Sequence, residues 1–113
     1  MIAKKLVRFR REVRDNVAKN EFGTQKWYQH GKLHRDGDKP AVIRADGTLM
    51  WYHRGKLHRD GDKPALIVAS GTRVWYQDGK YHRNGDKPAV IEADGTRKWY
   101  QHGKRQRTTN LLY

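Results

Sequence analysis

A chain of 113 residues with 35% hydrophobic residues and a net charge of +13 is the size of one small domain, with too few apolar residues for a thick core. The absence of cysteine excludes disulfides and thiolate metal sites, and no run of 18 apolar residues offers a membrane-spanning helix. The positive charge favours polyanionic partners, namely nucleic acid, an acidic protein surface or anionic lipid.

Residues 1–22 are predicted to form a basic N-terminal helix or cap. Ile2, Leu6, Phe9, Val13 and Val17 recur at helical spacing. The helix either closes the open end of a sheet or binds a polyanion or lipid surface, and an extended strand is the third possibility. The basic residues available for binding are Lys4, Lys5, Arg8, Arg11 and Arg14. No secretory signal is recognisable, so we expect a cytoplasmic location, in the host cell if the protein is viral.

A 24-residue unit then repeats at residues 25–48, 49–72 and 73–96, and a fourth copy starts and stops halfway. Each copy carries an adjacent Trp-Tyr pair, beginning with Trp27-Tyr28. Gly23-Thr24 matches the end of a unit, so residues 16–22 are expected to hold a degenerate strand of a preceding copy. The repeat region spans residues 23–107, and residues 108–113 form a C-terminal tail.

Each unit contains three turn sequences, which in the first copy are His30-Gly31, Asp36-Gly37 and Asp46-Gly47. Short runs rich in β-formers separate the turns, and a proline opens one strand of each unit. The sequence therefore predicts an all-β fold, an antiparallel meander or β-hairpin repeat array. Adjacent Trp and Tyr side chains point to opposite faces of a strand, and we expect the Trp row to be buried and the Tyr row to face outward. The aliphatic residues expected beside the Trp row are Val42, Leu66, Val90, Ile43, Ile67 and Ile91.

The pattern WYxxGKxHRxxGDKPAxI resembles the MORN-type repeats of bacteriophage and giant-virus proteins. It departs from the core MORN motif by the insertion HRxxGDKPA and is similar to a MORN variant. The resemblance covers residues 23–107 and implies a β-hairpin array. It also implies protein–protein or phospholipid contacts, although a fold does not carry a function with it.

His34, His58 and His82 occupy the same position of successive units, each four residues before an aspartate (Asp38, Asp62 and Asp86). Stacking spreads such residues along the array at a spacing of about 10 Å, twice the strand spacing, so they do not converge on one metal ion. We expect instead that His and Asp hold the long turn by hydrogen bonds and ion pairs. No nucleophile–base–orienter set is present. We therefore predict no metal, no cofactor and no enzymatic activity.

The repeats place three rows of basic residues and one row of aromatic residues along the array. Such a surface can bind a polyanion such as nucleic acid, because aromatic rings stack on bases and cations pair with phosphates. The alternative is that neighbouring acids neutralise these rows, which then form only a soluble surface. The candidate binding residues of the repeats are Lys32, Lys56, Lys80 and Lys104; Arg35, Arg59, Arg83 and Arg107; Arg105; and Tyr28, Tyr52, Tyr76 and Tyr100. Lys39, Lys63 and Lys87 form the third basic row.

The charge is concentrated at the two ends, with +4 in residues 1–24 and +5 in residues 97–113. Three hypotheses remain open: a virus-encoded protein that engages an acidic host protein or nucleoprotein, a direct nucleic-acid binder, and an adaptor on anionic membrane surfaces. Homo-oligomerisation through open sheet ends is also possible, because unpaired strand edges can pair between chains.

Overall fold

The computed structural model describes residues 17–19 and 23–109. This part of the chain is all-β, and its sheets are antiparallel and built from hairpins, as the sequence predicts. The predicted N-terminal helix lies almost wholly outside the described residues. Val17, the last residue of its apolar stripe, belongs to a strand instead, and the expected degenerate strand is therefore confirmed at residues 17–19.

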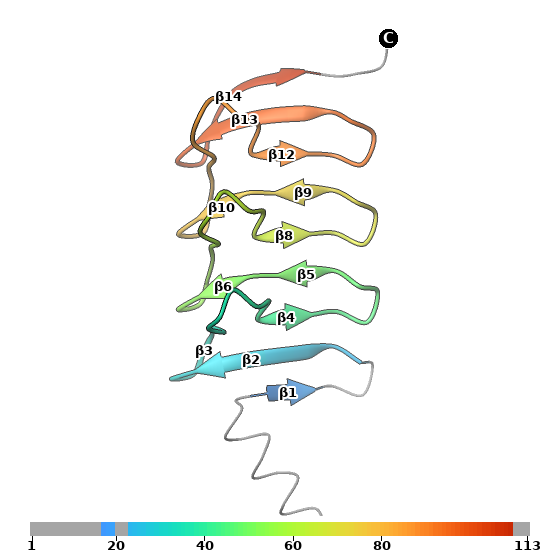
Figure 1. Ribbon diagram of the computed structural model, residues 1–113, viewed down its shortest axis with the longest axis vertical. Coiled ribbons are helices and arrows are strands. Elements are labelled where there is room, and N and C mark those ends of the chain that lie inside the picture. The colour runs from blue at the N-terminus through green and yellow to red at the C-terminus, as the bar shows by residue number, and fades with distance from the viewer. Residues whose placement is uncertain (1–16, 20–22, 110–113) are drawn as a thin grey trace, which may run out of the picture.

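Fourteen short strands follow one another in the described residues (Figure 1). The strands of the first half are β1 Val17–Lys19, β2 Gln25–Gln29, β3 Lys32–Leu33, β4 Val42–Ile43, β5 Leu49–Met50, β6 Tyr52–His53 and β7 Lys56–Leu57. Those of the second half are β8 Leu66–Ile67, β9 Arg73–Val74, β10 Tyr76–Gln77, β11 Lys80–Tyr81, β12 Val90–Ile91, β13 Arg97–Gln101 and β14 Lys104–Thr109.

One sheet runs the length of the array, in the order β1-β2-β4-β5-β8-β9-β12-β13-β14, and small hairpins extend from it along one edge (Figure 1). Each complete unit thus contributes two strands to the main sheet. Strand β1 pairs with β2 through Ala18 and Lys26, as β4 pairs with β5 through Val42 and Met50. The segment at 17–19 is therefore the last strand of a preceding unit.

A single cross-strand row supplies much of the core on one face of the main sheet. In the order of the sheet, this row contains Lys26, Val42, Met50, Leu66, Val74, Val90, Lys98 and Thr108. Val42, Val74 and Val90 are buried, whereas the expected Leu66 and the row of Ile43, Ile67 and Ile91 are half-buried. Lys26 on one side and Lys98 and Thr108 on the other flank the large apolar members of the row, and Ala18 of β1 continues the row beyond Lys26.

The opposite face carries the tryptophans. Trp27, Trp51 and Trp75 are buried, as predicted, and Trp99 in the incomplete unit is half-buried. Ala41, Ala65 and Ala89 have no exposed surface at all, a tighter packing than the sequence pattern had indicated. The backbone N–H of Trp51 donates to the carbonyl of Ala65 at 2.7 Å, and equivalent bonds join the tryptophan and the alanine of the other two complete units.

The predicted turns are present, and their geometry explains their residues. His30 and Gly31, with φ of 52° and 76°, form the two-residue turn between β2 and β3, where both central residues have a left-handed backbone. In the Asp-Gly-Thr turn the backbone N–H of Thr48 donates to Oδ1 of Asp46 at 2.8 Å. These turns fix strand register locally, since each depends on contacts within a few residues.

The last strand closes the array differently from the others. In a complete unit the row partner of Lys26 is Val42, 16 residues later, but the partner of Lys98 is Thr108, only 10 residues later. Strand β14 therefore omits the long loop and runs directly along β13, with a bulge between Trp99 and Tyr100. All six of its side chains are exposed, and a basic, polar edge of this kind resists edge-to-edge pairing.

Candidate binding surface

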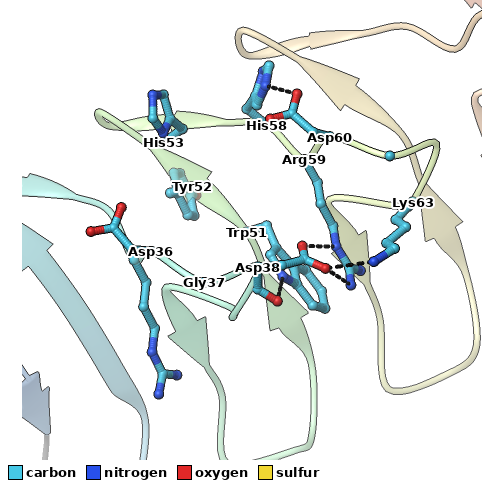
Figure 2. A pocket seen from close by; sticks show the side chains of 12 residues that line it. Asp36, Gly37, Asp38, Trp51, Tyr52, His53, His58, Arg59, Asp60 and Lys63 are labelled. Carbon is cyan, nitrogen blue, oxygen red and sulfur yellow. Dashed lines mark hydrogen bonds and ion pairs between the residues drawn. The ribbon is translucent and has the colours of Figure 1, made fainter.

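A cluster of tryptophan, arginine, aspartate and lysine recurs where one unit meets the next (Figure 2). The guanidinium of Arg59 stacks over the Trp51 ring at 3.7 Å, and its Nε donates to Oδ1 of Asp38 at 2.9 Å. Nζ of Lys63 donates to Oδ2 of the same aspartate at 2.8 Å. Asp38 also accepts the indole N–H of Trp51 at its backbone carbonyl, at 3.2 Å.

The next pair of units repeats the arginine and lysine contacts with Arg83, Lys87 and Asp62, at 2.9 Å and 3.0 Å, but the buried indole N–H of Trp75 has no hydrogen-bond partner among the described residues. These contacts with arginine and lysine lower the pKa of both Asp38 and Asp62 to about 2. Arg107 occupies the same position over Trp99 at 4.0 Å and reaches Asp86 at 3.4 Å. The candidate residues Arg59, Arg83 and Arg107 are therefore engaged within the array.

The histidine row connects successive units as well. Nε2 of His34 lies 2.8 Å from Oδ1 of Asp36, and its Nδ1 accepts the backbone N–H of Arg54 in the next unit at 2.9 Å. The contact with a carboxylate in the same turn agrees with the prediction, but the partner is two residues away and is not Asp38. An acceptor at Nδ1 places the ring proton on Nε2.

The other two histidines repeat this pattern with Asp60 and Asn84. The second unit also has His53 where other units have glutamine, and its ring lies 4.6 Å from that of His34. In the part of the chain that the structure describes, no three His, Cys, Asp or Glu side chains converge on a possible metal position.

The tyrosine row is less exposed than its predicted outward position implies. Tyr28, Tyr52, Tyr76 and Tyr100 are all half-buried. The Tyr81 ring, which lies 5.0 Å from that of Tyr76 and 4.7 Å from that of Tyr100, covers part of the row. Burial raises the pKa of Tyr76 and of Tyr52. These rings pack against the array, and only part of each ring is exposed.

The lysines beside the hairpin turns remain available. We call Lys32, Lys56, Lys80 and Lys104 the lysine ladder. All four are exposed, and none of them forms an ion pair in the described residues. The aliphatic part of each of the first three lysines packs over the turn glycine of the next unit. At Gly55, for example, a side-chain Cβ would lie only 3.6 Å from Cβ of Lys32. The glycines let successive lysines align along one edge of the array.

Two open grooves of about 390 Å³ each follow the same repeat, one lined by Arg59, Lys63, Asp36 and His53, the other by the equivalent residues of the next unit. The arginine and lysine walls formed by Arg59, Lys63, Arg83 and Lys87 are already paired across the units, whereas Arg35, which also lines the first groove, forms no ion pair in the described residues. Arg105 on β14 is exposed and adds to the basic edge. The candidates Lys4, Lys5, Arg8, Arg11 and Arg14 lie outside the described residues.

Comparisons with protein-family models, with curated proteins and with solved structures found no match to this chain. Within the described residues, no helix has the length and apolar character needed to span a membrane.

Proposed function

We propose that this chain is a non-enzymatic, virus-encoded binding protein of the MORN-variant type, which engages an acidic surface on a host protein or nucleoprotein. The observation that carries the proposal is the lysine ladder, a row of exposed cations without ion-pair partners in the described residues. Arg59, Arg83 and Arg107 of the neighbouring row are engaged by tryptophan and aspartate. The ladder is therefore an aligned row of uncompensated charge, whereas other exposed basic residues without ion pairs in the described residues, such as Lys26, Arg44 and Arg97, lie outside it.

A direct nucleic-acid binder is the alternative that shares this charge. Single-stranded nucleic acid binding relies on aromatic rings that stack on bases. The four repeat tyrosines are half-buried, and this favours an acidic protein surface over stacked bases. Lysines spaced at about 10 Å suit carboxylates scattered over a surface. The same lysines could also contact phosphates, so the salt dependence of binding is what separates the two partners.

The test compares two variants with equal loss of charge. The ladder variant replaces Lys32, Lys56, Lys80 and Lys104 by glutamine. The control variant replaces four exposed basic residues elsewhere, namely Lys26, Arg44, Arg73 and Arg97. Binding of labelled poly-glutamate and of a random DNA duplex is measured by fluorescence anisotropy at several salt concentrations.

We expect the ladder variant to bind poly-glutamate about 30-fold more weakly, because four exposed pairs at roughly 0.5 kcal/mol each sum to about 2 kcal/mol. The control variant should lose much less. Equal losses in the two variants would show that net charge alone acts and would contradict the proposal. Tighter binding of DNA, with a steep dependence on salt, would favour the nucleic-acid alternative. Capture from host lysate with and without nuclease then separates a protein from a nucleoprotein.

A further inference from the structure

The array contains its own example of a carboxylate-binding site. In the second unit, Nε and Nη2 of Arg59 lie 2.9 and 3.3 Å from the two carboxylate oxygens of Asp38, and Lys63 lies 2.8 Å from one of them. The third unit holds Asp62 in the same way, at 2.9, 3.4 and 3.0 Å. In both cases the carboxylate comes from the preceding unit. We call each such pair of one arginine and one lysine a fork. Both forks bind a carboxylate from outside their own unit.

The first unit carries the same fork, formed by Arg35 and Lys39. Arg35 stacks over Trp27 at 3.7 Å, and its Nη1 donates to the carbonyl of Pro40 at 3.1 Å, as Arg59 does to the carbonyl of Pro64 at 3.0 Å. These two contacts fix the orientation of the guanidinium.

The side chain of Lys39 runs past the turn glycine as those of Lys63 and Lys87 do. The distance from the lysine Cε to the Cβ position of that glycine is 3.9 Å for Lys39, 3.7 Å for Lys63 and 3.8 Å for Lys87. The backbone and both side chains of the first fork therefore match the two occupied forks.

The aspartate that fills the two later forks has no counterpart at the equivalent sequence position before this one. The residue 24 positions before Asp38 is Arg14, a cation. In the described residues neither Arg35 nor Lys39 forms an ion pair. Partial burial lowers the pKa of Arg35, since burial penalises its charged form. Such a guanidinium gains from an anionic partner, because a charge-assisted bond offsets the cost of its desolvation.

We propose that Arg35 and Lys39 bind an aspartate or glutamate side chain of the partner protein. The inference rests on the proposed function, because it assumes an acidic protein partner, and it adds the place at which one acidic side chain is recognised. A carboxylate fits better than a larger anion, because the occupied forks hold two oxygens of one planar group against Nε, Nη2 and Nζ. The site lies in the first complete unit.

The experiment follows the side-chain Nε–H groups of the arginines by NMR in the full chain. Hexaglutamate is the probe, and inorganic phosphate is the second arm. The Nε–H signals of Arg59 and Arg83 should already show a charged acceptor, and that of Arg35 should shift towards them only as hexaglutamate is added. Arg35→Gln and Lys39→Gln should each weaken hexaglutamate binding about three- to tenfold, whereas Arg97→Gln should leave it within twofold. Lys39 is exposed, so its variant remains informative if Arg35→Gln does not fold.

Three outcomes would overturn the inference. An Arg35 Nε–H that is already bonded without probe would show that the chain's own Glu12, Asp15 or Glu21 fills the fork. A signal that does not move at saturation would show that the fork is no site. A shift with phosphate and none with hexaglutamate would show an anion site of another kind. If the ladder variant loses binding while the Arg35 signal stays still, the proposed function holds and only this inference fails.

Discussion

Nε of Arg59 lies 2.9 Å from Oδ1 of Asp38, a residue 21 positions earlier in the preceding unit. The same guanidinium stacks on Trp51 of its own unit. Arg59 therefore connects the core of one unit to the long turn of its neighbour. In repeat proteins, stability depends on such nearest-neighbour interfaces. Arg59, Arg83 and Arg107 are thus part of the scaffold, and binding is left to other residues that this scaffold displays, Arg35 among them.

Arg59→Lys should destabilise the chain by about 1–2 kcal/mol. Lysine keeps the charge but loses the planar stacking on Trp51 and the two-pronged contact with Asp38, which are the features that distinguish arginine. Urea unfolding followed by tryptophan fluorescence measures the change. Arg97→Lys on the exposed part of β13 is the matched control and should shift stability by less than about 0.5 kcal/mol. Equal effects of the two changes would contradict a structural role for Arg59.

The stability of the array should fall in acid through Asp38 and Asp62. Their pKa of about 2 in the folded chain lies below the ordinary value of 3.8, so their contribution is present above pH 4 and is lost as pH falls towards 2. Both side chains are 42% exposed, and solvent screening reduces the contribution to about 1 kcal/mol or less for each.

The measurement is urea unfolding at pH 6 and at pH 2.5. In the double variant Asp38→Asn and Asp62→Asn the loss of stability between these pH values should shrink, since the amides do not titrate. Asparagine is the suitable replacement, because both positions have a left-handed backbone, with φ of 54° and 55°. A pH dependence unchanged by the double variant would show that other groups are responsible.

The sequence predicted the features that depend on local chemistry. The 24-residue period, the Gly-containing turns and the burial of Trp27, Trp51 and Trp75 all follow from residues close together in the chain. Turn geometry needs only a few residues, and a strand places neighbouring side chains on opposite faces. These predictions therefore required no knowledge of how the units stack.

The contacts between units could not be predicted in the same way. In this repeat, Arg59 lies three residues before the aspartate of its own unit and 21 residues after the aspartate of the preceding unit, and Arg83 has the same two spacings. The sequence pattern alone therefore does not show which of the two aspartates an arginine contacts. The partner of Arg59 is Asp38 and not its own Asp62, and the partner of His34 is Asp36. The packing of Ala65 was missed for a related reason, since a small residue gives a weak hydrophobic signal in a sequence although it marks a close approach of strands.

Ala65→Val should cost about 1–3 kcal/mol. Ala65 has no exposed surface, and its backbone is hydrogen-bonded to Trp51 and to Val74, so two added methyl groups have no space unless their surroundings shift. Ala69→Val, four residues later at an exposed position, should change stability by less than about 0.5 kcal/mol. Thermal or urea unfolding of the two variants makes the comparison. A similar small effect at both positions would show that the interior can expand at no cost.

His82→Phe should destabilise the interface between the third unit and the incomplete fourth unit. The N–H of His102 donates to Nδ1 of His82 at 3.0 Å, and phenylalanine fills the buried space without offering an acceptor. The loss should be about 1–3 kcal/mol. Hydrogen exchange checks the cause, because the amide of residue 102 should exchange faster. The amide of Gly103, which donates to the carbonyl of Tyr81 at 2.8 Å, serves as the internal reference. Uniform acceleration of both amides would indicate general unfolding and not the loss of this bond.

Arg54→Asn should stabilise the chain by up to about 1 kcal/mol. Arg54 precedes Gly55 in a two-residue hairpin turn and has φ of 52°, a left-handed backbone that asparagine adopts with less strain than arginine. The bond from its backbone N–H to His34 does not depend on the side chain and should remain. Arg54→Val removes the same charge but adds a branched side chain at the strained position, and it should destabilise the chain. Urea unfolding of the two variants separates backbone strain from charge. Stabilisation by Arg54→Asn alone would support relief of strain, whereas stabilisation by both variants would show that the gain comes from the reduced positive charge.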